Sequence, residues 1–220
     1  MSAGVSQQLA DHVVTHRAGD LAATDIHEAK RALLNFVGCA LGGAGHPAVD
    51  ISIAALGRFR GEKTAAVLGR RDRYDPLFAA FLNGISSHVH DFDDTTPSNY
   101  IHPTSPVASA LFAWASENEV SGRDFLHAFV LGYEVVTRIG NATYPAHYQA
   151  GWHSTGSIGV FGAAAAVGRL IGLTPAQMRH ALGLAATQAA GIRDNFGAMA
   201  KSFHPGRAAE AGYMAALLAQ

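Results

Sequence analysis

The sequence is poor in cysteine and in charge: Cys39 is its single cysteine, and charged residues make up 15% of 220 residues. One cysteine cannot form a disulfide within the chain or supply the several thiolates of an iron–sulfur cluster or a structural zinc site. The net charge is -1 with histidine neutral, and no basic block or stripe is present. Binding to nucleic acid or to an anionic membrane depends on such a positive field, so neither partner is expected.

Long apolar runs are also missing. No uninterrupted apolar segment reaches the roughly 20 residues that span a bilayer, and the N-terminal MSAGVSQQLADHVVTHRAGD lacks the apolar core of a signal peptide. These features predict a cytoplasmic protein with no membrane partner. Hydrophobic residues, in contrast, are abundant at 49%, and a chain of 220 residues can bury a sizeable core.

Helical signals run through almost the whole chain and predict one all-α domain over residues 1–220. Apolar residues recur at helical spacing from Gly4 to His16 and again after Thr24, which we expect to cap the second helix. A further helix is expected from about Pro47 to Phe59. The segment TAAVLG at residues 64–69 is the one plausible strand, and it is short.

Capping signals mark several helix starts. Asp75-Pro76 and Ser105-Pro106 each place a capping side chain before a proline at the first helical position. Ser121 resembles the start of a capping box, and Thr174-Pro175-Ala176-Gln177 combines a cap, a first-turn proline and a box. The last segment, GRAAEAGYMAALLAQ, has a helical pattern and no capping signal, so we expect the chain to stop within a helix or just after one.

Ionisable residues are concentrated at residues 90–107, HDFDDTTPSNYIHPTSPV. A D-x-D-x-T pattern occurs in phosphotransferases that use magnesium, but the preceding ISSHVH is not the buried strand that such a loop follows. A D-x-D-D pattern occurs in helical isoprenoid cyclases, but 9% aromatic residues offer little for their aromatic-lined cavity. Asp93 and Asp94 can equally be interpreted as caps of the neighbouring helices.

Three stretches taken together resemble one family. They are HDFDDT followed by His102-Pro103, GWHSTGSIGVFGAAAAVGRLIGL at residues 151–173, and GAMAKSFHPGRAAEAGYMAALLA at residues 197–219. Their order and spacing resemble the helical domain of the MmgE/PrpD family, which includes 2-methylcitrate dehydratase and cis-aconitate decarboxylase. The resemblance covers the whole chain and implies an all-α, multi-helix domain. It also implies a second α+β domain that is absent from this chain, because family members are much longer.

The resemblance further implies an activity and a site. Family members are lyases that process small di- and tricarboxylates without a metal or organic cofactor, usually as dimers. We therefore expect a polycarboxylate substrate, a homodimer, no cofactor and no metal. The positions that match the family's active-site motifs are Asp91, Thr95, His102, His153 and Lys201.

Each of these positions has an expected role. By resemblance, Asp91 contacts substrate or positions a histidine, and Thr95 and Lys201 bind substrate carboxylates. Asp91 and Thr95 would share one face if the preceding helix continued. His102 and His153 each precede an expected helix start, where free backbone N–H groups favour an anion. Their ordinary pKa suits an acid–base pair, and the pattern leaves open which one is the acid.

Two further cations follow Lys201 in the third stretch. His204 and Arg207 are expected to bind substrate, with Arg207 as a second carboxylate clamp or, equally, as the partner of a structural ion pair. Each site residue also has a plain interpretation, such as a surface lysine for Lys201 or a backbone-bonded histidine for His102. The other histidines are expected on the surface or in the core, because no H-x-x-x-H pattern carries a metalloprotease glutamate.

The reaction stays open among dehydration, decarboxylation and epimerisation, and dehydration is preferred as the commonest activity in the family. A rival hypothesis from another class is a non-catalytic helical dimerisation or scaffold module, or one half of a split enzyme. A third is a metal-dependent hydrolase that uses the aspartates and histidines. Polycarboxylate binding and chelator sensitivity would distinguish these possibilities.

Overall fold

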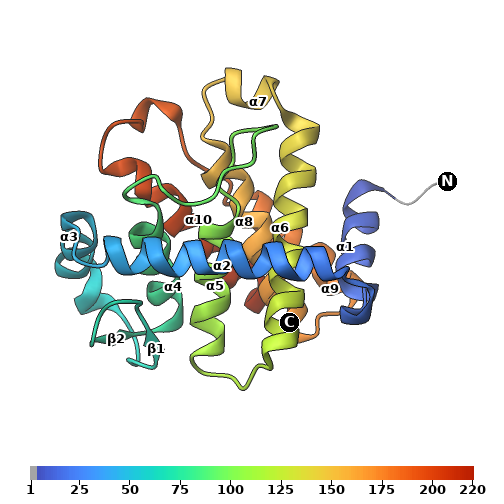
Figure 1. The fold of residues 1–220 in the computed structure, drawn as a ribbon, viewed down its shortest axis with the longest axis horizontal. Coiled ribbons are helices and arrows are strands. Elements are labelled where there is room, and N and C mark those ends of the chain that lie inside the picture. The colour runs from blue at the N-terminus through green and yellow to red at the C-terminus, as the bar shows by residue number, and fades with distance from the viewer. Residues whose placement is uncertain (1–3) are drawn as a thin grey trace.

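The structure, a computed structural model, describes residues 4–220 and confirms an all-α domain (Figure 1). Short 3-10 helices lie at Ala18–Asp20, Gly57–Phe59 and Arg193–Asn195, and strands β1 (Ala65–Ala66) and β2 (Arg73–Tyr74) form an antiparallel pair. The α-helices are α1 (Val5–Thr15), α2 (Ala23–Gly43), α3 (Pro47–Leu56), α4 (Pro76–His88), α5 (Thr104–Ala115), α6 (Gly122–Thr143), α7 (Ala146–Gln149), α8 (Ser154–Ile171), α9 (Pro175–Ala186) and α10 (Ala200–Leu218).

Most of the expected helix starts are confirmed. The carboxylate of Asp75 accepts a hydrogen bond from the backbone N–H of Phe78, and Ser121 Oγ accepts one from Asp124. Thr174 and Gln177 form a reciprocal capping box at the start of α9. These local contacts satisfy backbone donors that the first helical turn leaves unpaired, which is why the sequence predicts them well.

Two expected caps are wrong. Helix α2 begins at Ala23, with Ala22 as the N-cap residue, so Thr24 lies inside the first turn. Helix α5 begins at Thr104, one residue before Ser105. The hydroxyl of Ser105 is instead shared with its neighbour α4, where it lies 2.8 Å from Ser87 Oγ. A contact between helices has therefore replaced the local cap.

Helix α8 lies at the centre of the domain and packs between α6 and α10, while α2 crosses in front of α4, α5 and α6 (Figure 1). Residues 154–171 are long and apolar enough to cross a membrane, but 78% of this segment is buried inside the protein. The four consecutive alanines at 163–166 are completely buried. Their small side chains allow the neighbouring helices to approach closely, so α8 is a core helix.

The crossing of α4 and α10 positions two residues of the candidate site. A Cβ atom added to Gly84 would lie 2.5 Å from the Cα atom of Gly206, so the two backbones touch at this point. The two helices are antiparallel, so the C-terminal end of α4 lies beside the N-terminal end of α10. His88 at the end of α4 and Lys201 at the start of α10 are consequently brought to the same region.

Candidate active site

The polar stretch after α4 is a loop that turns back on itself. Helix α4 ends at His88, and Asp91 has a left-handed backbone with φ of 59°. Asp91 and Thr95 therefore do not share a helix face, because the helix does not continue through them. The reversal at Asp91 folds residues 91–95 beside His102 at the other end of the loop.

Asp91 is the meeting point of two candidate catalytic residues. Lys201 Nζ donates a hydrogen bond to Asp91 Oδ1 at 2.6 Å, and His102 Nε2 lies 3.6 Å from the same oxygen. Burial alone would raise the pKa of Asp91, but the hydrogen bond and charge of Lys201 lower it below its usual range. The structure thus brings Asp91, Lys201 and His102 together in one cluster.

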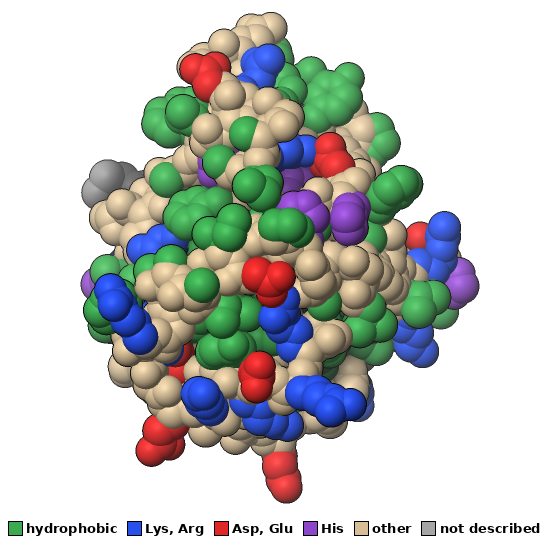
Figure 2. All heavy atoms as spheres, turned by 90° about the vertical axis from the view of Figure 1, so that its left-hand side faces the viewer, with side chains coloured by type: hydrophobic (Ala, Val, Ile, Leu, Met, Phe, Trp, Pro, Cys, Tyr) green, Lys and Arg blue, Asp and Glu red, His purple; other side chains and the backbone are tan. Residues whose placement is uncertain are grey.

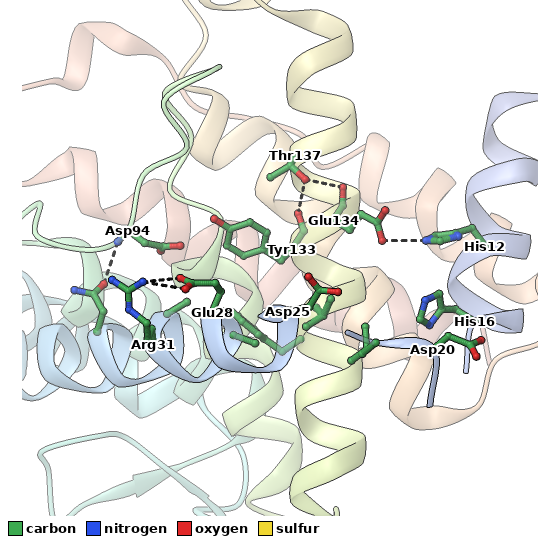
Figure 3. A pocket seen from close by; sticks show the side chains of 16 residues that line it. His12, His16, Asp20, Asp25, Glu28, Arg31, Asp94, Tyr133, Glu134 and Thr137 are labelled. Atoms are coloured by element: carbon green, nitrogen blue, oxygen red, sulfur yellow. Dashed lines mark hydrogen bonds and ion pairs between the residues drawn. The ribbon is translucent and has the colours of Figure 1, made fainter. Parts of the chain in front are cut away.

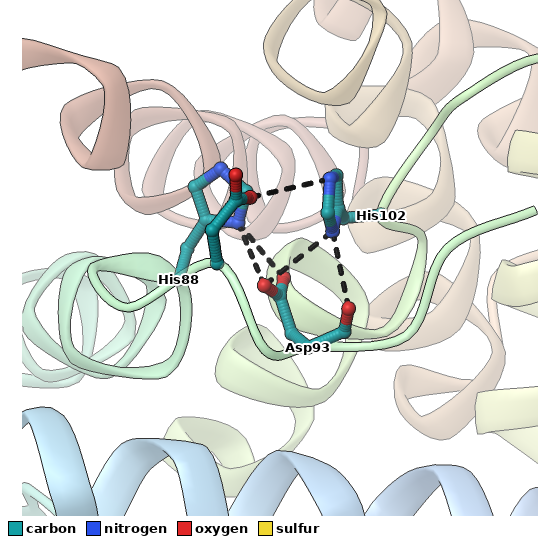
Figure 4. Close-up of side chains that lie close together, drawn as sticks. His88, Asp93 and His102 are labelled. Carbon is teal, nitrogen blue, oxygen red and sulfur yellow. Dashed lines mark hydrogen bonds and ion pairs between the residues drawn. The ribbon is translucent and has the colours of Figure 1, made fainter. Parts of the chain in front are cut away.

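Asp93 lies beneath this cluster and joins two histidines (Figure 4). His88 Nδ1 donates to the Asp93 carboxylate at 2.9 Å, and His102 Nδ1 lies 3.4 Å from Asp93 Oδ1. The side chains of His88 and Asp93 are fully buried. Burial opposes ionisation, yet hydrogen bonds from His102 and His88 outweigh it and hold the pKa of Asp93 well below its usual range. A buried carboxylate anion therefore stands next to His102.

That anion decides the charge of His102. Burial of the ring lowers its pKa, but the hydrogen bond and charge of Asp93, together with the charge of Asp91, raise the pKa above its ordinary value. Thr95 Oγ1 lies 3.3 Å from His102 Nδ1, and the backbone N–H of His102 donates to Thr155 Oγ1 at 3.1 Å. His102 is consequently a well-oriented ring whose protonated form is favoured by its carboxylate neighbours, so that it can act as a proton donor.

His153 has the opposite electrostatic character. It is the N-cap residue of α8, is 2% exposed, and hydrogen-bonds through Nδ1 to Nδ1 of His204 at 2.8 Å. Burial and the neighbouring His88 and His204 lower the pKa of His153 to about 2. The ring of Phe196 meets His153 edge-on, with centroids 4.9 Å apart. His153 is therefore a neutral histidine, whereas the neighbouring carboxylates favour the protonated form of His102.

Helix N-termini from different parts of the chain meet at the cluster. His102 precedes α5, His153 caps α8, and Lys201 lies in the first turn of α10. The rings of His88 and His153 stack with centroids 5.9 Å apart, and His88 meets His102 at 4.6 Å. Unpaired N–H groups and helix dipoles favour anions at such ends. Together with Lys201 and His102, they make the region suited to a ligand with several carboxylates.

A cavity borders the cluster. It has a volume of about 300 Å³ and is lined by Asp91, Lys201, His88 and the turn at 197–199, among others. This volume is at the lower end of the range of small-molecule sites. On the corresponding face of the molecule, histidine side chains lie among hydrophobic ones (Figure 2). The space therefore suits a small acid of about the size of citrate.

The two remaining candidate residues lie away from Asp91. His204 is buried behind His153. Arg207 donates to Glu210 at 2.7 Å and lines a separate cavity of about 240 Å³ with His204 and Asn195. Of the two interpretations of Arg207, the structure contains the ion pair. Substrate binding by His204 and Arg207 stays a prediction.

The same cluster has the donors of a metal site. One ligand atom each from His88, Asp91, Asp93 and His102 lie within 4.8 Å of one another. Two imidazoles and two carboxylates form a donor set that could hold zinc. Lys201 ammonium lies 2.6 Å from Asp91, so the chain also supplies a cation of its own at this point.

A larger cavity, of about 770 Å³, lies on the other side of the loop, between α2 and α6 (Figure 3). Its charged lining is mainly acidic. The carboxylates in that lining are Asp20, Asp25, Glu28, Asp94 and Glu134. Like charges repel, so this cavity does not suit a polycarboxylate in spite of its size.

Asp94 lines the larger cavity and differs electrostatically from its neighbour Asp93. Burial raises the pKa of Asp94 to about 6, with the charge of Asp93 adding to the effect. Its Oδ2 accepts a hydrogen bond from Thr104 Oγ1 at 2.7 Å. Neither Asp93 nor Asp94 is the N-cap residue of α5, so the capping interpretation of these residues is wrong.

Sequence reasoning missed the supporting residues. His88 was expected on the surface or in the core, and Asn195, which contacts His204, was not considered. His88 and Asp93 approach His102 because the chain reverses at Asp91, and helical spacing contains no sign of such a reversal. The accumulation of acids and histidines at residues 88–102 was the available signal. It indicated the region of the site and did not indicate which side chains contact one another.

Comparison with known proteins identifies the family of this chain. Residues 7–220 match the MmgE/PrpD N-terminal domain. The chain is 35% identical to the cis-aconitate decarboxylase-like protein oryM of Aspergillus oryzae, over 98% of this chain and 47% of that protein. It is 34% identical to cis-aconitate decarboxylase of Aspergillus terreus and 30% identical to that of Homo sapiens, covering 94% and 100% of this chain and 44% and 47% of the relatives. The chain spans about half the length of the curated relatives it matches. It belongs to the MmgE/PrpD family.

Proposed function

We propose that this domain carries the acid–base and anion-binding part of a cofactor-independent lyase for a small di- or tricarboxylate, such as cis-aconitate or 2-methylcitrate. The observation that carries the proposal is the cluster of Lys201, Asp91 and His102 at converging helix N-termini. The similarity to cis-aconitate decarboxylases favours decarboxylation over the dehydration expected from family frequency.

The cluster supplies the groups that a decarboxylation needs. Lys201, Thr95 and the helix N-termini bind the carboxylates that are retained. When the C–C bond to the departing carboxylate breaks, carbon dioxide leaves and the electron pair stays on the substrate carbon. His102, an imidazolium held by Asp93, donates its proton to that carbon and later regains one from solvent. A dehydration would place the same proton on the departing hydroxyl group, and a base would have to take a proton from the neighbouring carbon.

Calorimetric titration of the 220-residue chain with citrate, 2-methylcitrate, cis-aconitate and iminodisuccinate tests the proposal. We expect saturable binding that Lys201→Ala weakens roughly 10- to 100-fold, the effect of about 1.5–3 kcal/mol for a hydrogen bond to a charged group. The matched control is Lys63→Ala, which removes an exposed lysine remote from the cluster and should leave binding unchanged.

The outcome ranks the substrates as well as testing the site. Equal loss of affinity in both lysine variants would show a diffuse charge effect and contradict a formed carboxylate site at Lys201. A folded chain that binds none of these acids would contradict anion binding by this domain.

A further inference from the structure

A chain of hydrogen bonds lies behind His153. Its Nδ1 is 2.8 Å from Nδ1 of His204, whose Nε2 is 3.1 Å from Nδ2 of Asn195. His204 is 6% exposed and His153 is 2% exposed, so both rings are shielded from solvent. Because each nitrogen of His204 is committed to one partner, the proton of one ring constrains the proton of the next.

The direction of the chain follows from the donor groups. The amide nitrogen of Asn195 can only donate a hydrogen bond, so Nε2 of His204 accepts it. Burial and the charges near His204 lower its pKa, which favours a neutral ring with one N–H. That N–H is on Nδ1 and donates to Nδ1 of His153. The single proton of neutral His153 is then on Nε2.

The backbone at two glycines approaches His204 closely. A Cβ atom at Gly156 would lie 2.9 Å from Cβ of His204, and one at Gly191 would lie 3.3 Å from its Cγ. The carbonyl oxygen of Gly191 also accepts the backbone N–H of His153 at 3.0 Å. Glycine at both positions lets the two histidines pack closely, and this tight packing fixes the rings relative to each other.

The free end of the chain lies beside His88, which lines the cavity at Lys201. Among the hydrogen bonds of residues 4–220, the ring of His153 takes part through Nδ1, and none involves its Nε2. His88 stacks on the ring and Phe196 meets it edge-on. Neither of these ring contacts is a hydrogen bond, so Nε2 is left for a ligand.

We propose that Asn195 and His204 are positioning residues that hold His153 as a neutral, Nε2-protonated hydrogen-bond donor to a substrate carboxylate. The role of the donor rests on the proposed function, while the tautomers are a property of the free chain. His153 then binds and orients the substrate, and His102 donates the proton. The two active-site histidines are thereby assigned different roles by their hydrogen-bond partners.

The tautomers can be read from ¹H–¹⁵N NMR spectra of the chain labelled at histidine nitrogens. We expect a protonated Nε2 and an unprotonated Nδ1 in His153, a protonated Nδ1 in His204, and a nitrogen–nitrogen coupling across their hydrogen bond. The His16–His127 pair, with nitrogens 3.0 Å apart, provides an internal control of the same kind in another part of the fold. A proton on Nδ1 of His153 in the free chain would overturn the proposal.

Asn195→Asp tests the direction of the chain. The new carboxylate accepts instead of donating, so Nε2 of His204 should gain a proton while the His16–His127 signals stay unchanged. An Nε2 of His204 that stays unprotonated in the variant would contradict the positioning role of Asn195.

Addition of cis-aconitate separates the two proposals. Saturable binding that moves the His153 Nε2–H signal supports the donor role, and saturable binding that leaves it in place contradicts that role. Absence of binding would contradict the proposed function, whereas the tautomers in the free chain would already have been decided.

Discussion

At the scale of single residues, the site depends on a carboxylate that does not itself face the cavity. Asp93 is buried beneath His88 and His102 and lines neither the cavity at Lys201 nor the opposite one. Its anion stabilises the imidazolium of His102, and so the proton that the reaction needs. The ability of His102 to donate a proton thus depends on its neighbour Asp93.

Asp93→Asn tests this dependence. Removing the charge should lower the pKa of His102 by about one to three units, because an opposite charge at this distance produces shifts of that size. NMR titration of the His102 ring against pH measures the change without needing turnover. Asp72→Asn, an exposed aspartate, is the control and should leave the titration unchanged.

The expected sign is definite. His102 in the unchanged chain stays protonated above its ordinary pKa, and in Asp93→Asn it should lose its proton at lower pH. In a complete enzyme, activity that depends on the protonated acid is lost as pH rises. In the variant this loss should occur at a lower pH than in the unchanged protein. An unshifted titration in Asp93→Asn would mean that Asp91 alone sustains the imidazolium.

At the scale of helices, the sequence predicted what local contacts determine. Asp75, Ser121 and Thr174 cap their helices because the capping atoms lie within one turn of each other. Ser105 failed as a cap because its hydroxyl contacts α4, and Asp91 and Thr95 failed to share a helix because the chain reverses. Contacts between distant segments decide both failures, and spacing in one sequence does not encode them directly.

The crossing of α4 and α10 gives a prediction at this scale. Gly84→Ala places a Cβ atom 2.5 Å from Gly206 Cα, and backbone cannot move aside as a side chain does. We expect a loss of about 1–3 kcal/mol in the free energy of unfolding, the usual cost of overpacking a core. Denaturant unfolding followed by circular dichroism measures it.

Gly38→Ala is the matched control for that experiment. Gly38 lies within α2, and a Cβ atom there would meet nothing within 4 Å. Alanine should therefore stabilise the protein by about 0.5–1 kcal/mol through the helix propensity alone. Equal effects of the two substitutions would contradict the close approach of α4 and α10.

At the scale of the whole molecule, buried histidines make stability depend on pH. The pKa of His153 is lowered to about 2, and burial and Arg169 lower that of His127 to about 4. Below their ordinary pKa these rings accept protons in the unfolded chain and not in the folded one, so stability falls as pH falls. Asp94 acts in the opposite direction, because its pKa is raised to about 6 and the folded state holds the extra proton.

The balance of these groups predicts a definite slope. Near pH 5 these two histidines outweigh the one carboxyl group, and the lowered pKa values of His147 and His204 act in the same direction. The free energy of unfolding should therefore rise by at least about 1.4 kcal/mol per pH unit. Above about pH 6.5 the raised pKa of His102 reverses the trend, because stability is lost as that ring deprotonates. The maximum is therefore expected near neutral pH.

Urea unfolding at a series of pH values measures this profile. His127→Gln, which removes a ring that is 3% exposed, should lower the slope near pH 5 by about 1 kcal/mol per pH unit. His180→Gln, at an exposed position, should leave it unchanged. A slope that is the same in both variants would show that the burial of His127 does not contribute to the loss of stability in acid.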